Sequence, residues 1–201
     1  IMNRLSDIGE FGLINRFTNL FNSALPEGFT GIGDDCAILQ ADEHISNLVT
    51  TDMLIEDRHF VKDKISPENL GYKSLAVNLS DIAAMGGAPK AAFLSMGIPK
   101  DTEVEWLDRF FQGVNELAES SNTYILGGDT TQSPDKLVIN FTVLGTIENK
   151  EIKTRNKARP GDLICLSGEI GDCAGGLQVL LDNLPENQDT EYLVTKHVRP
   201  R

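Results

Sequence analysis

The stretch 67–89 constrains the fold most, because it marks both ends of one long helix. Pro67 suits the first turn of a helix, whereas Gly86 and Pro89 supply the C-terminal glycine and the later proline that stop one. Apolar spacing predicts further helices over 10–25 and 104–117, the last opened by a capping box at 102–105. Apolar or β-branched runs predict strands over 31–39, 46–51, 91–98, 124–126 and 137–147.

This order of elements predicts an α/β fold of the α+β sandwich type. We expect a mixed, largely antiparallel sheet with helices on one face, because most connections between strands are short. A polar, basic stretch at 149–161 then changes the pattern and marks a domain boundary. We therefore expect an N-terminal metal- and ATP-binding and dimerisation domain at 1–148, and the beginning of an incomplete C-terminal domain at 149–201.

The second unit is short. A strand over 162–167 and a helix over 171–181 are expected to open it, but about fifty residues are too few to build an independent core. The sequence also contains three cysteines, Cys36, Cys165 and Cys173, with no CxxC pair and no Cys/His zinc pattern.

Charge and hydropathy exclude several classes of partner. A net charge of -12 argues against nucleic acid, because a phosphate backbone needs a Lys/Arg-rich face. It leaves nucleotides open, since bound Mg²⁺ inverts the local field. No apolar run of membrane-spanning length, signal peptide or lipidation signal is evident, so we expect no membrane partner and a cytoplasmic location.

Several acidic residues stand in unusual settings. Asp34 and Asp35 lie on a glycine-flanked turn, Asp52 ends an apolar strand, Asp81 interrupts an apolar helix face, and Asp129 follows two glycines. Hard carboxylate oxygens are the ligands that Mg²⁺ prefers, and it usually combines a few of them with substrate phosphates and water. Together these residues predict a site for Mg²⁺ ions.

Each of these residues also has a purely structural interpretation. Asp34 and Asp35 can simply form a turn. In strand geometry their side chains would point to opposite faces. Asp81 can be a structural residue whose carboxylate is satisfied by N–H groups or an arginine. A lone His59 is more often a packing residue. No nucleophile or general base is assigned, and there is no Walker A, GxGxxG or kinase HRD/DFG pattern.

Taken together, the motifs resemble those of the thiamine-monophosphate kinase family. The segments that carry the resemblance are Gly31–Cys36, Thr51-Asp52 with His59-Phe60, Leu75–Gly86, Gly127–Thr131, and Arg155 before Arg159–Asp162. They occur in order along essentially the whole chain. Single motifs of this set are shared with a wider ATP-binding superfamily that includes aminoimidazole ribonucleotide synthetase.

The resemblance implies Mg²⁺-dependent, direct phosphoryl transfer from ATP to thiamine monophosphate, giving thiamine diphosphate. It also implies a homodimer in which the sheets of two first domains pair. The implied Mg²⁺ ligands are Asp35, Thr50, Thr51, Asp52, Asp81 and Asp129. Gly128, Asp129 and Arg155 are implied to contact ATP, and His59 the acceptor.

The family's second domain carries an Asp-x-Ser-Asp-Gly segment that this sequence does not reach, so we expect a truncated chain. Two alternatives remain open. One is a non-catalytic, Mg²⁺- and nucleotide-binding dimerisation module. The other is a different ATP-using member of the superfamily that acts on a purine-pathway substrate.

Overall fold

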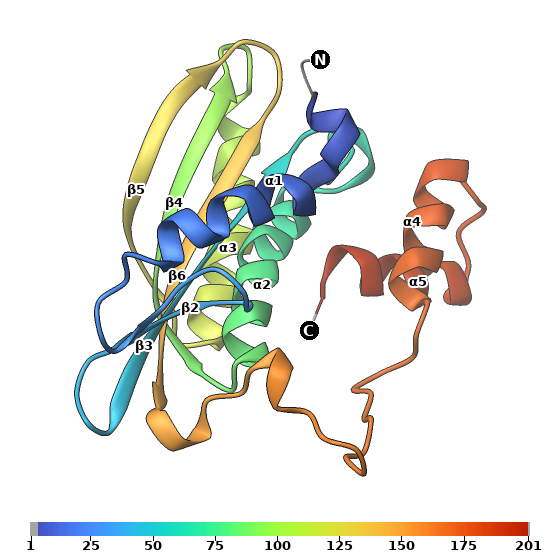
Figure 1. The fold of residues 1–201 in the computed structure, drawn as a ribbon. Helices are drawn as coiled ribbons and strands as arrows, with labels where there is room; N and C mark the ends of the chain where they lie inside the picture. The colour runs from blue at the N-terminus through green and yellow to red at the C-terminus, as the bar shows by residue number, and fades with distance from the viewer. Residues whose placement is uncertain (1–3, 201) are drawn as a thin grey trace.

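The computed structural model describes residues 4–200, and its centre is a six-stranded sheet with helices α2 and α3 against one face (Figure 1). The strands are β1 (Phe29–Thr30), β2 (Ala37–Gln40), β3 (Ile45–Ile55), β4 (Ala88–Pro99), β5 (Tyr124–Ser133) and β6 (Val138–Glu148). The α-helices are α1 (Leu5–Asn22), α2 (Pro67–Ala84), α3 (Val104–Ser120), α4 (Asp172–Asp182) and α5 (Gln188–Val198). Short 3₁₀ turns are η1 (Lys62–Lys64), η2 (Asn149–Glu151) and η3 (Arg155–Lys157).

The strands lie in the order β1-β2-β3-β6-β4-β5. Every neighbouring pair is antiparallel except β4 and β5, which are parallel and are connected through α3. The long central pair, β3 and β6, runs in register from Ile45↔Glu148 to Ile55↔Val138. This confirms the predicted fold class of a mixed, largely antiparallel sheet with helices on one face.

The core lies between the sheet and the two long helices. Alternate residues of β6, including Ile139, Phe141 and Val143, are fully buried toward α2 and α3, whose Leu75 and Phe110 are buried in turn. Burying large apolar side chains contributes on the order of 1.5–3 kcal/mol each. This alternation with period two is what fixes one face of β6 toward the helices.

Two glycines let α2 and α3 cross closely. A Cβ atom on Gly71 would lie 2.0 Å from the Phe110 carbonyl oxygen, and one on Gly113 would lie 1.8 Å from that of Glu68. Any larger residue at either position would push the helices apart. The resulting rigid pair holds the C-terminal half of α2, which carries Asp81, against β3.

The ends of α2 agree with the sequence prediction, whereas the start of α3 does not. The Ser66 side chain accepts a hydrogen bond from the Asn69 N–H at 3.2 Å, and Gly86 takes a left-handed φ of 81° directly after the helix. The predicted capping box at 102–105 is wrong, because Glu103 occupies the N-cap without a side-chain hydrogen bond. The Thr102 hydroxyl is instead buried without a partner among the described residues.

Two strand predictions also need correction. The predicted strand over 31–39 is regular only from Ala37, because 31–36 form an irregular loop between β1 and β2. The predicted strand over 162–167 is absent from the structure. No described strand lies beside it to accept its backbone hydrogen bonds, and Ile164 is 96% exposed.

The helices at the two ends of the chain differ in what holds them. The predicted helix over 10–25 forms as α1, yet its apolar side chains remain exposed, with Phe11 at 78%. Helices α4 and α5 pack on each other. Arg199, directly after α5, connects them to α2 and α3, because its guanidinium donates to Asn69 Oδ1 at 2.7 Å and to both Glu116 carboxylate oxygens at 2.6 Å. Among residues 4–200 no helix is long and apolar enough to cross a membrane.

Candidate active site

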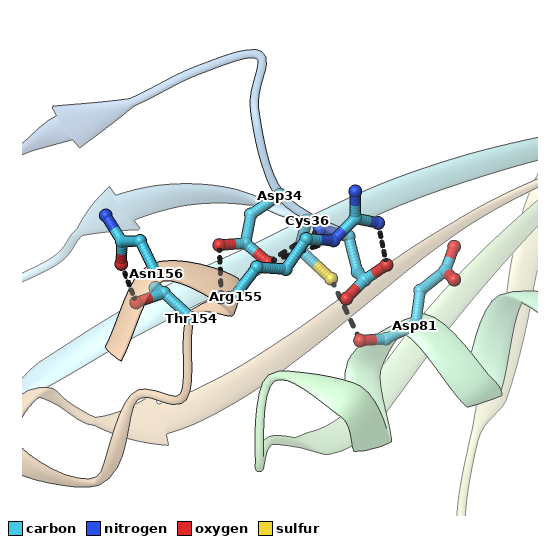
Figure 2. Close-up of polar contacts among 7 residues, drawn as sticks. Asp34, Cys36, Asp81, Thr154, Arg155 and Asn156 are labelled. Atoms are coloured by element: carbon cyan, nitrogen blue, oxygen red, sulfur yellow. Dashed lines mark hydrogen bonds and ion pairs between the residues drawn. The ribbon is translucent and has the colours of Figure 1, made fainter. Parts of the chain in front are cut away.

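The loop between β1 and β2 carries two aspartates that both contact the same arginine. The backbone N–H of Arg155, in η3, donates to Asp34 Oδ2 at 3.1 Å, and its guanidinium forms an ion pair with Asp35 Oδ1 (Figure 2). The expectation that Asp34 and Asp35 point to opposite sides is therefore wrong. Because this segment is a loop and not a strand, its side chains need not alternate.

A second group of polar residues lies where β3 meets the C-terminal half of α2. The Thr50 hydroxyl donates to Asp81 Oδ2 at 2.6 Å. The backbone N–H of Asp52 donates to the side-chain oxygen of Asn78 at 2.9 Å, and Asn78 is fully buried one turn before Asp81. These bonds fix the spacing between the strand and the helix at the position of the two carboxylates.

The acidic groups of the loop, β3 and α2 act on one another electrostatically. Burial raises the pKa of Asp81, and the negative charges of Asp52 and Asp35 raise it further, while the Thr50 hydrogen bond and Arg155 oppose this. The structure therefore brings together Asp35, Thr50, Asp52 and Asp81 of the predicted metal ligands. In this state Arg155 supplies the positive charge that the cluster needs.

Cys36 lies beneath this cluster. Its sulfur is within hydrogen-bonding distance of the Asp81 carbonyl oxygen, at 3.4 Å, and its side chain is 2% exposed. Burial, followed by the charges of Asp81, Asp35 and Asp34, raises the pKa of Cys36 to about 12. The thiol is therefore neutral and acts as a packing group below the carboxylates.

Thr51 and Asp129, also predicted as metal ligands, lie on the other face of the sheet. Thr51 pairs with Thr142 of β6 and its hydroxyl donates to the Phe141 carbonyl at 3.0 Å. Asp129 pairs with Ser95 of β4, which in turn pairs with Asn140 of β6. Since paired residues share a face and neighbours along a strand alternate, Thr51 and Asp129 face away from α2 and Asp81.

Gly128 has a structural reason to be glycine. Its φ is 155°, and a Cβ atom there would lie 1.6 Å from the Leu94 carbonyl oxygen of the neighbouring strand. This close approach of β5 to β4 requires glycine whether or not a phosphate binds beside it. The predicted contact of Gly128 with ATP stays a prediction.

His59 lies in the turn after β3, at the wall of a cavity of about 250 Å³. Its Nδ1 accepts a hydrogen bond from the Ile55 N–H at 3.0 Å, which holds the turn. The cavity continues between Lys73 of α2, Leu177 of α4 and His197 of α5. The predicted role of His59 in binding the acceptor is not tested by this geometry.

The donor set of the cluster suits a hard cation that also contacts other ligands. Carboxylate and hydroxyl oxygens are the groups that Mg²⁺ prefers. Burial raises the pKa of Asp81, the charges of Asp52 and Asp35 raise it further, and a cation between these groups would offset both effects. Among residues 4–200, however, no three His, Cys, Asp or Glu side chains are close enough to form a finished cage. A cation here would therefore complete its shell with water or ligand phosphates.

Two residues of this site were not among the predicted ligands. Asn78 shares a helix face with Asp81, three residues earlier, and this spacing was the available signal for its role in holding Asp52. Asp34 belonged to the predicted acidic group, but of the adjacent pair only Asp35 was implied as a ligand. The contact of Asp34 with the Arg155 backbone joins residues 121 positions apart in sequence, so no local pattern encodes it.

Comparisons with known proteins identify relatives of this chain. Residues 33–147 match the family described as AIR synthase related protein, N-terminal domain. Thiamine-monophosphate kinase of Bacillus subtilis (strain 168) is 40% identical over 196 residues, covering 95% of this chain and 59% of that protein. The enzyme of the same name from Escherichia coli (strain K12) is 39% identical, covering 96% and 58%.

A solved structure gives the same result for the fold. AaThiL complexed with AMPPCP and TMP superposes with a TM-score of 0.90 at 35% identity, covering 100% of this chain and 62% of that one. The chain thus spans less than two thirds of the length of these relatives. Through the domain at 33–147, which holds the carboxylates of β3 and α2, this chain belongs to the AIR synthase related protein family, and its resemblance to thiamine-monophosphate kinases is confirmed.

Proposed function

We propose that this chain is the ATP- and Mg²⁺-binding part of an enzyme that phosphorylates thiamine monophosphate to thiamine diphosphate. The observation that carries the proposal is the cluster of Asp35, Thr50, Asp52 and Asp81 beside Arg155, in a chain 40% identical to a thiamine-monophosphate kinase. The relatives are longer than this chain, so their activity is transferred here as a proposal and not as a property of these 201 residues.

The residues of the cluster have distinct roles in this proposal. Asp35, Asp52 and Asp81, with the hydroxyl of Thr50, would hold the cations, and Asn78 keeps Asp52 in place. Thr51, like Asp129, lies on the other face of the sheet and would add an oxygen ligand only where a second copy comes close. Bound Mg²⁺ neutralises the charge of the polyphosphate and of the acceptor phosphate, which otherwise repel each other. Phosphoryl transfer of this kind depends on alignment and charge, so no protein nucleophile is required.

Arg155 changes partners when nucleotide binds. In the structure its guanidinium is paired with Asp35, and a cation on Asp35 would release it to contact ATP phosphates. Gly128 lets the backbone of β5 come close to the nucleotide, and Asp129 adds a further carboxylate. His59, in the cavity wall, contacts the acceptor.

The open face of the sheet, which is the face that α2 and α3 do not cover, supports the proposed homodimer. Met53 and Phe93 on this face are 52% and 39% exposed, although they lie in central strands of the sheet. Pairing of two such faces would bury them and bring Asp129 of one copy toward a second copy. We also retain the domain boundary at 148/149 and a cytoplasmic location as parts of the proposal.

Binding and turnover are tested separately. Calorimetry of the 201-residue chain should show ATP binding that depends on Mg²⁺ and is weakened about tenfold or more by Asp81→Asn. Asp135→Asn, in the exposed turn between β5 and β6, is the matched control and should leave the affinity unchanged. Equal affinity with and without Mg²⁺ would remove the basis of the proposal.

The substrate is tested in a chain extended to the length of its relatives. ADP release should require thiamine monophosphate and not occur with a purine ribotide. The opposite preference would select another ATP-using member of the superfamily. Metal-linked ATP binding without turnover in the extended chain would select the non-catalytic dimerisation module.

A further inference from the structure

The three cysteines have very different surroundings. Cys36 is buried with its pKa raised to about 12, whereas Cys165 and Cys173 are both exposed. Cys165 lies in the irregular segment before α4. Cys173 lies in the first turn of α4, and its sulfur is 3.5 Å from Nδ1 of His197 in α5.

A lysine completes the cluster around Cys173. The Lys73 Nζ lies 3.2 Å from His197 Nε2, and Nδ1 of the same ring lies 3.2 Å from the Cys173 carbonyl oxygen. The cluster therefore joins α4, α5 and α2, and it is separate from the acidic site. Neither the comparisons nor the proposed function uses Cys173.

The hydrogen-bond partners define which ring nitrogen carries the proton. Burial, and then the charge of Lys73, lowers the pKa of His197, so the ring is neutral at neutral pH. A lysine ammonium can only donate, so Nε2 is the acceptor and Nδ1 carries the hydrogen. That N–H points at both the carbonyl oxygen and the sulfur of Cys173.

The neighbouring cavity of about 250 Å³ is rich in basic groups. Arg58, Lys64 and Lys73 line it together with His59 and His197. Asp57 is the single acidic residue in its wall, and Lys136 already forms an ion pair with that carboxylate. In a chain of net charge -12, this is a local site that attracts anions.

We propose that Cys173 is a thiol-exchange site for small anionic disulfides, with His197 as hydrogen-bond donor to the sulfur and the basic cavity as the docking site for the reagent. The thiol loses its proton to solvent, and the thiolate attacks one sulfur of the disulfide. A new sulfur–sulfur bond to Cys173 forms, the bond of the reagent breaks, and the second half leaves as a thiolate with the electron pair. A free thiol reverses the step by the same exchange.

The adduct would sit where α4 and α5 meet α2. His197 and Lys73 belong both to the cysteine cluster and to the cavity wall, so modification changes the cavity that His59 also lines. This inference does not depend on the proposed function, because it uses only residues outside the acidic site.

The test compares the cysteines within one protein. The native chain is treated at neutral pH with a limiting amount of a bis-nitrobenzoate disulfide, which is anionic, and each cysteine is quantified by peptide mass spectrometry. Cys173 should react about tenfold faster than Cys165, the effect of one hydrogen bond to a charged sulfur, and Cys36 should not react. Equal rates at Cys173 and Cys165 would overturn the proposal without any variant.

Two substitutions and a second reagent separate the two parts of the site. His197→Phe should reduce the rate at Cys173 to that at Cys165, and Lys73→Met should reduce the preference for the anionic reagent over a neutral dipyridyl disulfide. The rate at Cys165 in the same sample is the matched control and should not change. A rate at Cys173 that is unaffected by both substitutions would also contradict the proposal, provided that circular dichroism shows native folding.

Discussion

The two faces of the sheet carry different halves of the predicted metal site. Thr50 of β3 faces α2 and bonds to Asp81, whereas Thr51, the next residue, faces the open side and bonds to the Phe141 carbonyl. The covered face also holds Asp52, and the open face holds Asp129. Residues that form one motif in sequence are therefore divided in space by the alternation of a strand.

The difference shows which interactions one copy of the chain can make by itself. On the covered face, burial raises the pKa of Asp81, and the charges of Asp52 and Asp35 raise it further within one copy of the chain. On the open face, Asp129 of β5 is separated from β3 by two strands, β6 and β4. The covered face is therefore the core of the proposed site, and the open face contributes only if a second surface comes close.

The largest expected effect concerns the strand that places Asp129 on the open face. Gly128→Ala would put a Cβ atom 1.6 Å from the Leu94 carbonyl oxygen at a φ of 155°. We expect a loss of about 3 kcal/mol or more in the free energy of unfolding, measured by urea denaturation. Gly168→Ala, where no atom lies within 4 Å of the added Cβ, is the control and should change it by less than about 0.5 kcal/mol. A mild effect of Gly128→Ala would mean that β5 can shift its register, and the assignment of faces would fail.

The covered face could be predicted from the sequence in large part. Helix α2 has strong end signals in Ser66, Pro67 and Gly86, and the alternation of β6 identifies its buried face. Asp81 stood out because it interrupts an apolar helix face, and the structure places it beside Thr50 and the two other carboxylates.

The remaining features depend on contacts that local patterns do not encode. The loop at 31–36 has strand-like composition, but Arg155 and the irregular backbone decide its conformation. The segment 162–167 has the apolar residues of a strand without a neighbouring strand to pair with. Thr51 is separated from Asp81 by the alternation of side chains along β3, whereas the position of Asp129 depends on the order of strands in the sheet, which no local pattern encodes.

The next largest effect is on Mg²⁺-dependent ATP affinity, when one carboxylate from each face of the sheet is replaced in turn. Asp52→Asn should weaken Mg²⁺-dependent ATP binding about tenfold, because Asp52 lies with Asp81 and its backbone remains held by Asn78. Asp129→Asn should weaken it less than about threefold at concentrations where the chain is monomeric. Calorimetry with sedimentation analysis of the same samples measures both. If Asp129→Asn has the larger effect in a monomer, the covered face is not the core of the site.

The smallest expected effect is the loss of folding stability that the raised pKa of Asp81 causes when no ligand is bound. The pKa of Asp81 is raised above its ordinary value of 3.8, so above that pH the unfolded chain releases a proton that the folded chain still holds. Stability therefore falls as the pH rises from 3.8 through the folded pKa, and the loss persists at neutral pH. Asp81→Asn removes this loss and keeps an oxygen that can accept from Thr50. The variant should be more stable than the parent at neutral pH by up to about 1 kcal/mol, since solvent reaches the carboxylate, and equal to it at the acid end. Thermal unfolding over this pH range measures the difference.

Adding ATP and Mg²⁺ should reverse the order of stability of the parent and Asp81→Asn, because the ligands stabilise the chain that binds them more tightly. If the parent is the more stable at neutral pH without ligand, Asp81 is a structural carboxylate satisfied by its neighbours, and the covered face has no unmet need for a cation.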